Sequence, residues 1–389
     1  MMDLLCEDVQ RLIVSNLDST AQLSKTSKHW KHICETSKVH FPNHVNSTIF
    51  TLQGLQKNGP VYMPYVNILD LNYLQFNNCN LDLLTALKAL RLHERHNLNL
   101  ILKICFDVMI LPGVQQFLQS LTFSEVHYES ILCGNTFTFH TTAIWCLPFA
   151  FIHLQCPTLK KLVLLEEDPC SSSYGNEALQ KAFCCKHLVD LEVESFLCGT
   201  LSLAMNSSLK SLKLGDQRLS YEKNAALLQL ACPNLVEFSL QRSNLNRYDL
   251  EHFKWQLWPR LKCLDLSKNY NLSFQVWPLG LESLNIMDTC FTIDQLECLD
   301  FTSLKVFKAD IQTNLKWFSF FLNHCFDTVH LNVRNFLHGR QYLNRVDLVH
   351  DFWTCIHAKH LSLGFKDIFY TREILTLIQE TCRCHVTIL

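Results

Sequence analysis

Cysteine and histidine are the residues of this sequence whose numbers alone suggest chemistry. The chain of 389 residues contains 19 cysteines and 18 histidines, and thiolate and imidazole groups are common zinc ligands. Structural zinc sites usually draw on Cys-x-x-Cys pairs, and the sequence has none. The densest groupings are Cys184-Cys185 with His187, and Cys382 with Cys384 and His385. Because adjacent or alternate cysteines rarely point toward one tetrahedral ion, we expect no metal, no cofactor and mostly buried free thiols.

Motifs for covalent catalysis and phosphate binding are also missing from the sequence. It contains no Gly-x-Ser-x-Gly elbow, no Gly-x-Gly-x-x-Gly and no Gly-x-x-x-x-Gly-Lys, which are the usual signatures of a nucleophile or a phosphate loop. Its 10 glycines leave little backbone that could approach a phosphate closely. We therefore expect a protein that is not an enzyme.

Charged residues recur beside alternating leucines in the middle of the chain, and these are the candidate binding residues. Residues that flank inward-pointing leucines on a strand project to its opposite face. The face is polar and carries both charges, with one acidic cluster, which suits a protein substrate or a basic peptide. A merely solvated face is the alternative. The candidate substrate-binding residues are Asp190, Glu192, Glu194, Lys213, Glu237, Asp265 and Lys308.

The elements that would position these charges form a repeat. Leucines or their substitutes occupy positions 1, 4 and 6 of successive short segments. Four steps separate Leu209 from Leu304, which gives a period of about 24 residues, within the range of about 20 to 29 for leucine-rich repeats. The clearest copies are Leu159, Leu162, Leu164; Leu188, Leu191, Val193; Leu209, Leu212, Leu214; Leu235, Phe238, Leu240; Leu261, Leu264, Leu266; and Leu281, Leu284, Ile286.

Weaker copies flank this central array. Upstream they are Val66, Leu69, Leu71 and Leu118, Leu121, Phe123; downstream they are Leu304, Phe307, Ala309, then Val329 to Val333 and Leu361 to Leu363, with Val386 and Ile388 in a terminal strand. One repeat cannot bury its apolar face alone, so stacking predicts parallel strands on one surface and helical or irregular segments on the other.

Two repeat cores follow a Cys-Pro-x-Leu segment, at Cys156 to Leu159 and at Cys232 to Leu235. This arrangement resembles the cysteine-containing subtype of leucine-rich-repeat proteins. The resemblance implies an α/β fold for residues 46–389: a leucine-rich-repeat solenoid with parallel strands on the concave face and helices on the convex face.

The first 45 residues depart from the repeat and indicate a small helical module. Val9, Ile13 and Leu17 follow one another at helical spacing behind the acidic Glu7-Asp8, and Leu23 and Trp30 lie on a second amphipathic helix. Together, Leu5-Cys6-Glu7-Asp8-Val9, Ile13, Leu17-Asp18, Leu23 and Thr26-Ser27-Lys28-His29-Trp30 resemble an F-box.

The F-box resemblance implies a function. A small all-α F-box-like module over residues 1–45 would bind the Skp-type adaptor of a cullin-based ubiquitin ligase through Leu5, Val9, Ile13, Leu17, Leu23 and Trp30. The repeats over residues 46–389 would then hold the protein to be ubiquitinated. The alternative is a leucine-rich-repeat scaffold or regulator without a ligase role, in which the first helices cap the repeat stack.

Composition restricts the partners and the compartment. The formal net charge is -2, so there is no overall basic field to attract nucleic acid. The longest apolar run, near residues 143–152, is shorter than the roughly 20 residues that cross a bilayer, and the acidic start lacks a secretory n-region. We therefore expect neither nucleic acid nor membrane as a partner, and a cytoplasmic or nuclear location.

Overall fold

The computed structural model describes a set of segments that together cover most of the repeats. These are residues 68–71, 83–89, 100–105, 113–129, 136–165, 173–194, 206–215, 232–243, 254–270, 277–289, 291, 293–296, 299–311, 315–334, 353–366, 376, 378–380, 382 and 384–388. The contacts divide the chain into two compact units, Met1–Leu162 and Val163–Leu389. The expected helical module over residues 1–45, with Leu5, Val9, Ile13, Leu17, Leu23 and Trp30, lies outside the described residues.

The first unit is built on parallel strands that follow one another in chain order. They are β1 (Ile68–Asp70), β2 (Ile101–Cys105), β3 (Thr122–Glu129) and β5 (His140–Cys146). A separate parallel pair is formed by β4 (Phe137–Thr138) and β6 (Leu154–Gln155). The described helices between the strands are α4 (Leu83–Ala89), α6 (Val114–Gln119) and α7 (Pro148–His153).

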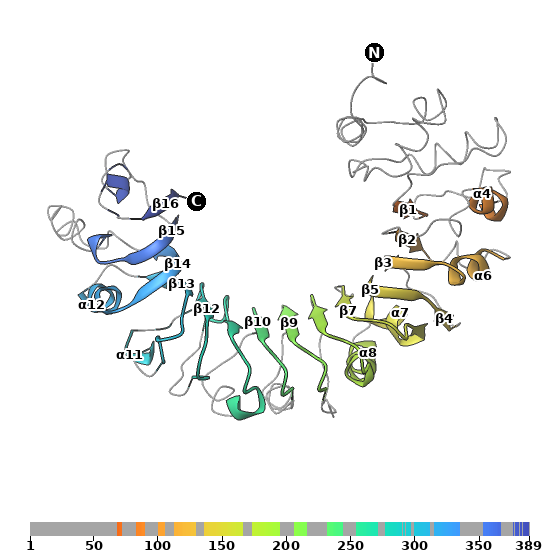
Figure 1. The fold of residues 1–389 in the computed structure, drawn as a ribbon, viewed down its shortest axis with the longest axis horizontal. Helices are drawn as coiled ribbons and strands as arrows, with labels where there is room; N and C mark the ends of the chain where they lie inside the picture. Colours follow the sequence, from red (N-terminus) through yellow and green to blue (C-terminus); the bar gives the residue numbers. More distant parts are fainter. Residues whose placement is uncertain are drawn as a thin grey trace, which may run out of the picture. The chain divides into compact units, whose positions relative to one another are not determined.

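The second unit continues the same plan, with every pairing between its described strands parallel (Figure 1). After β7 (Lys161–Leu164), which begins in the first unit, come β8 (Asp190–Val193), β9 (Ser211–Gly215), β10 (Glu237–Gln241), β11 (Cys263–Asp265), β12 (Ser283–Ile286), β13 (Val306–Ile311), β14 (Cys325–Arg334), β15 (His357–Lys366) and β16 (His385–Ile388). Between them lie α8 (Ser173–Cys184), the short 3-10 helix η6 (Trp255–Leu257), α11 (Ile293–Leu296) and α12 (Leu315–Asn323).

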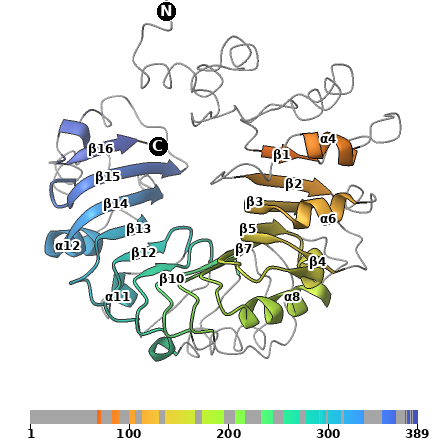
Figure 2. The ribbon, with the colours of Figure 1, turned by 45° about the vertical axis from the view of Figure 1, so that its right-hand side comes forward.

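Strands and helices occupy opposite sides of the second unit. Figure 2 shows α8, α11 and α12 on the outer side of the strands. Parallel strands need a crossover that returns the chain to the same edge of the sheet, and these short helices and loops supply it. The expected α/β class with parallel repeat strands is confirmed for the part of the chain that the structure describes. No helix among the described residues is long and apolar enough to span a bilayer.

The leucines of the second unit align in buried rows across the strands. Leu212 is in register with Leu191 on one side and Phe238 on the other. The row continues through Leu264, Leu284, Phe307, Val329, Leu361 and Val386. Its members from Leu191 to Leu361 are at most 2% exposed. The register predicted from the spacing of leucines is therefore confirmed from β8 to β16, including the weaker copies at Val329 and Leu361.

The cysteine before several repeat cores closes a turn that leads into the strand. The carbonyl oxygen of Cys232 accepts a 3.0 Å hydrogen bond from the amide of Leu235, and Cys156 and Cys185 accept equivalent bonds from residues three positions later. Cys232 is fully buried. A small, weakly polar side chain suits this site because the neighbouring repeat packs closely against it.

A buried amide links two neighbouring repeats at the opposite end of the strands from this turn. Asn269 lies eight residues after Leu261, is fully buried, and accepts a 2.9 Å hydrogen bond from the amide of Ser243 in the preceding repeat. Such a side chain satisfies backbone groups that the loop would otherwise leave unpaired.

The weak upstream copy at Leu118, Leu121 and Phe123 has a different register from the one its spacing predicts. Leu118 belongs to α6, and the β3 residue aligned with Leu102 is Val126. Leu121 and Phe123 are buried but precede the part of β3 that pairs with β2, which begins at Glu125. The prediction of a repeat core at these positions was therefore wrong, because valine and tyrosine replace leucine in the true core.

Candidate protein-binding face

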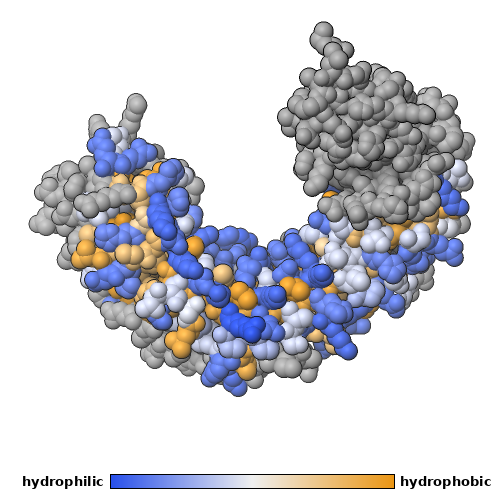
Figure 3. Space-filling view, in the orientation of Figure 1, coloured by the Kyte–Doolittle hydropathy of each residue, from blue (hydrophilic) through white to orange (hydrophobic). Residues whose placement is uncertain are grey.

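The polar residues that flank the buried rows of β8 to β16 form one surface, which we call the strand face. In β8, β9, β12 and β13 half-buried residues alternate with buried ones. Figure 3 shows hydrophilic residues gathered on the strand-bearing side of this unit. All seven predicted substrate-binding residues belong to these polar positions: Asp190, Glu192, Glu194, Lys213, Glu237, Asp265 and Lys308.

The acidic cluster lies at the start of the strand face. Asp190 and Glu192 are half-buried residues of β8, and Glu194 follows the strand and is exposed. Glu192 is in register with Lys213 on β9. Alternate residues of one strand project to the same side, so three carboxylates gather within a single repeat.

Lys213 and Glu237 are brought together by the pairing of β9 with β10. Lys213 Nζ lies 3.3 Å from Glu237 Oε1, and both side chains are more than 40% exposed. The other carboxylate oxygen, Oε2, accepts a 2.9 Å hydrogen bond from the hydroxyl of Ser211. Exposed pairs of this kind add little stability, but they fix the direction in which each side chain points.

Asp265 is held by donors from both neighbouring strands. Its Oδ2 accepts hydrogen bonds from Gln241 Nε2 at 2.8 Å and from Asn285 Nδ2 at 2.9 Å, and its Oδ1 accepts one from the amide of Ser267 at 2.9 Å. The carboxylate is therefore oriented before any partner arrives, which lowers the entropy lost on binding.

The far end of the strand face carries cationic and imidazole groups. Lys308 on β13 is in register with His330 on β14 and, through it, with Ser362 on β15. Burial lowers the pKa of His330, and the nearby charge of Lys308 lowers it further. His360 and His385 face each other across β15 and β16 with ring centroids 6.0 Å apart. The face thus changes from acidic at β8 to mixed at β13, where Lys308 and Asp310 occupy alternate half-buried positions, and to imidazole-bearing at β14 to β16.

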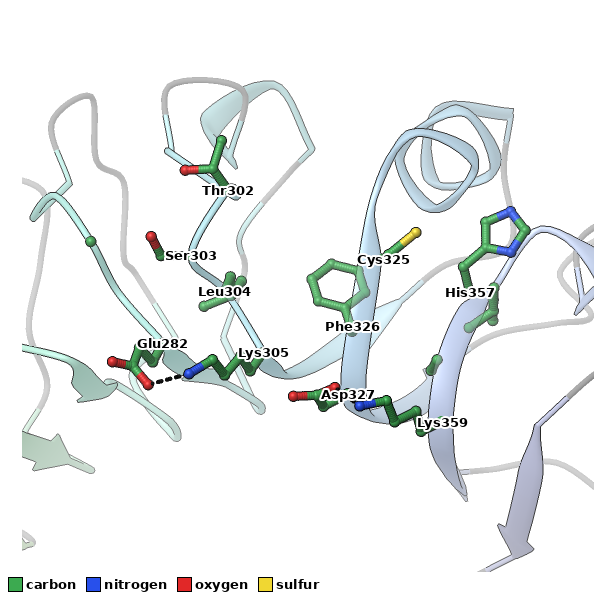
Figure 4. Close-up of a pocket in the computed structure, with 13 residues that line it drawn as sticks. Glu282, Thr302, Ser303, Leu304, Lys305, Cys325, Phe326, Asp327, His357 and Lys359 are labelled. Carbon is green, nitrogen blue, oxygen red and sulfur yellow. Dashed lines mark hydrogen bonds and ion pairs between the residues drawn. The ribbon is translucent and has the colours of Figure 1, made fainter.

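A ladder of alternating charges runs along the edge where strands β11 to β15 begin, and Figure 4 shows the part from Glu282 to Lys359. We define this charge ladder as Lys262, Glu282, Lys305, Asp327 and Lys359. Glu282 accepts hydrogen bonds from Lys262 at 2.6 Å and from Lys305 at 2.8 Å, while Lys359 Nζ lies 2.7 Å from Asp327. Hydrogen bonds from Lys262 and then Lys305 lower the pKa of Glu282 to about 2.

The charge ladder borders an open groove of about 670 Å³. Glu282, Lys305, Asp327 and Lys359 line it together with Cys325 and His357. Sequence reasoning missed these residues because it followed only the positions beside the strand leucines. Their signal was present, since each ladder residue occupies the second position of its repeat and the sign alternates from repeat to repeat.

The described cysteines differ in burial and do not gather into a metal site. Cys184 and Cys325 are exposed, whereas Cys146, Cys232, Cys355 and Cys382 are buried. Burial raises the pKa of Cys232 and of Cys382 to about 12. Among the residues that the structure describes, no group of three or more Cys, His, Asp or Glu side chains has an arrangement that could hold a metal ion.

Comparison with known proteins leaves the strand face as the main guide to function. No protein-family model matches the sequence, and a search of curated proteins found no significant match.

Proposed function

We propose that this protein is the substrate-recognition subunit of an SCF-type (Skp-cullin-F-box) ubiquitin ligase. In this proposal its leucine-rich-repeat solenoid holds a target protein on the strand face, and its amino-terminal module binds the Skp-type adaptor. The observation that carries the substrate-binding half is the run of oriented charges from Asp190 to Lys308 over consecutive parallel strands.

The character of the strand face favours a protein partner. Its charges have both signs, and several are held by neighbours before binding, as Asp265 is by Gln241 and Asn285. Charge patterns of this kind select partners and set the orientation in which they dock. An extended row of polar positions across many strands also offers far more area than a small ligand needs.

The sequence pattern over residues 3–36 supports the adaptor-binding half. An amphipathic helix pair too small to close its own core needs an apolar surface to cover it. The Skp-type adaptor is that surface in our proposal, and Trp30 is the aromatic anchor. A leucine-rich-repeat scaffold without a ligase role is the alternative, in which the same helices cap the first repeat.

Affinity purification of the full chain from cells under native conditions tests both halves together. The wild-type chain should retain the adaptor, the cullin and one or more targets. Trp30→Ala should lose adaptor and cullin and keep the targets, because truncation of a buried aromatic anchor typically costs about 2 kcal/mol or more. A chain that starts at residue 46 should behave in the same way and remain folded.

Reversal of the acidic cluster should give the opposite result. Replacement of Asp190, Glu192 and Glu194 by Lys should remove targets while adaptor and cullin remain, with little change in thermal unfolding because none of the three side chains is buried. Lysines at the exposed Glu177 and Glu380 serve as the charge-reversal control. A wild-type chain that retains partner proteins but neither adaptor nor cullin would favour the scaffold alternative, and an unchanged set of targets in the triple variant would exclude the acidic cluster from substrate binding.

A further inference from the structure

Trp145 stands among the polar residues on the strand-bearing face of the first unit. It is half-buried on β5 and is in register with His127 on β3, which is in register with Lys103 on β2. A half-exposed tryptophan in the middle of a polar row points to a binding site. Tryptophan is enriched where proteins bind one another and is a frequent energetic anchor there.

Both faces of the Trp145 ring are covered by cationic or imidazole groups. The His127 ring is stacked on it with centroids 4.7 Å apart and an angle of 2° between the ring planes. Lys161 Nζ lies 4.9 Å from the centroid of the Trp145 ring, and Lys161 begins β7, on the other side of β5 from β3. The indole therefore stands between two neighbours and offers its edge to a partner.

The charge around this stack is predominantly positive. Lys103 and Lys161 are half-buried lysines of the cluster, and Lys160 is an exposed lysine beside it. Two acidic residues lie on neighbouring strands: Glu125, whose Oε2 lies 3.5 Å from His127 Nε2, and Asp70 on β1, which is in register with Lys103. The edge of an aromatic ring carries the positive part of its quadrupole, so the ring edge and the lysines attract the same kind of group.

This arrangement discriminates between classes of partner. A nucleobase needs an open aromatic face on which to stack, and neither face of Trp145 is open. A carboxylate needs only an electropositive edge and nearby ammonium groups, and both are present. The stack also holds the indole in one orientation, so little side-chain entropy is lost when a partner binds.

We propose that the cluster of Lys103, His127, Trp145 and Lys161 binds an acidic segment of a partner protein, with an Asp or Glu carboxylate seated at the exposed edge of Trp145. The inference rests on the proposed use of the strand-bearing face for protein binding. It adds a second recognition site in the first unit, one that prefers an acidic partner segment, whereas Asp190, Glu192 and Glu194 would prefer a basic one.

The test uses a fluorescein-labelled peptide of alternating Glu and Gly and the full-length protein, with fluorescence anisotropy as the measurement. A peptide of alternating Gln and Gly is the matched probe. The Glu peptide should bind, the Gln peptide should not, and binding should weaken as NaCl increases because salt screens exposed charges. Trp145→Ala should weaken binding by about tenfold or more.

Two further variants separate binding from folding. Lys103→Gln with Lys161→Gln removes both charges while keeping unbranched polar side chains, so it should weaken binding of the Glu peptide without changing the unfolding temperature. Lys186→Gln, at an exposed position in the turn before β8, removes one charge elsewhere and should leave binding unchanged. Equal affinity of the double-Gln variant and the wild-type protein would overturn the proposal even if Trp145→Ala failed to fold.

Competing probes give the remaining outcomes. Tight binding of a phosphoserine peptide without binding of the Glu peptide would overturn the assignment of an acidic segment, as would displacement of the Glu peptide by oligo(dT). The measurement needs no adaptor and no natural target. Failure of peptide binding while adaptor and targets still co-purify would therefore overturn this inference alone, whereas peptide binding without adaptor would leave it intact and contradict the ligase proposal.

Discussion

Asn269 Nδ2 donates a 2.7 Å hydrogen bond to the carbonyl oxygen of Leu240, which belongs to the preceding repeat. The same amide group donates to the carbonyl oxygen of Leu266 at 2.9 Å within its own repeat. One buried side chain thus ties two loops together, and its carbonyl oxygen also accepts the amide of Ser243. Loss of this side chain would leave buried backbone groups without partners.

We expect Asn269→Ala to lower the free energy of unfolding by about 1 to 3 kcal/mol, the usual cost of buried polar groups left unsatisfied. Urea unfolding followed by circular dichroism measures it. Asn234→Ala is the matched control, because Asn234 donates to the Ser207 carbonyl at 2.7 Å in an exposed position where water can replace it. Equal losses in the two variants would contradict the role assigned to the buried amide.

A second prediction compares two leucines that differ in burial. Leu264 on β11 is 2% exposed, whereas Leu279 in the turn before β12 is 82% exposed. Leu264→Ala should cost about 2 to 5 kcal/mol of unfolding free energy because it opens a cavity between stacked strands. Leu279→Ala should change stability by less than about 0.5 kcal/mol. Thermal unfolding of both variants measures the difference, and a tolerant Leu264 would mean that the strand register is wrong.

The charge ladder predicts a dependence of stability on acid. The folded state holds the pKa of Glu282 near 2, below its ordinary value of 4.5, so ionised Glu282 favours folding above pH 4.5. That contribution declines as the pH falls from about 4.5 and is lost once Glu282 is protonated near pH 2. The Glu282 side chain is 30% exposed, and salt should therefore weaken the effect.

Glu282→Gln should flatten the fall in stability between about pH 4.5 and 2. Thermal unfolding over this range, at low and at high salt, measures it. Glu177→Gln on the exposed surface of α8 is the control and should show the same pH dependence of thermal unfolding as the wild-type protein. If Glu282→Gln and the wild-type protein had the same dependence of stability on pH, the ion pairs of Glu282 with Lys262 and Lys305 would contribute nothing to stability.

The cysteines of the repeats should differ in reactivity with iodoacetamide. The thiolate is the reactive form, and burial raises the pKa of Cys232 to about 12. Cys184 and Cys325 are exposed. At pH 8 in the folded protein, we expect alkylation of Cys184 and Cys325 and protection of Cys232. Mass spectrometry of the peptides measures which cysteines are alkylated. Protection of Cys232 should disappear in urea, and rapid labelling without denaturant would contradict its burial.

The sequence predicted the second unit well because its repeats keep leucine at the aligned positions. Leu212, Leu264 and Leu284 recur with a regular period, and that period determines which neighbouring residues face outward. The same reasoning succeeded only in part in the first unit: the predicted Leu69 and Leu71 are buried and Leu69 is aligned with Leu102, but the register of β3 was wrong and β5 was not predicted. Strand β5 has the sequence His-Thr-Thr-Ala-Ile-Trp-Cys, in which isoleucine takes the place of leucine in the aligned row, so neither the strand nor its register could be predicted.

Only the part of the candidate site that follows the leucine pattern was predictable from the sequence. The outward positions from Asp190 to Lys308 follow from the leucine register alone. The stack of His127 on Trp145 depends on the pairing of β3 with β5, which no leucine marks. The contacts of Glu282 with Lys262 and Lys305 depend on side-chain conformations that span three strands, and the pattern of one repeat does not contain them.

The charges from Lys262 to Lys359 alternate in sign only when the repeats follow one another in their present order. Tandem repeats can gain or lose whole copies by recombination, and an apolar row remains continuous after such a change when the new neighbours are also apolar. Deletion of residues 281–303 would put Leu304 in the place of Leu281 and keep the rows continuous. It would also set Lys305 beside Lys262 with no carboxylate between them. The two lysines would then repel each other at the junction. A shortened array would therefore lose stability at this edge of the sheet even though its apolar rows remained continuous.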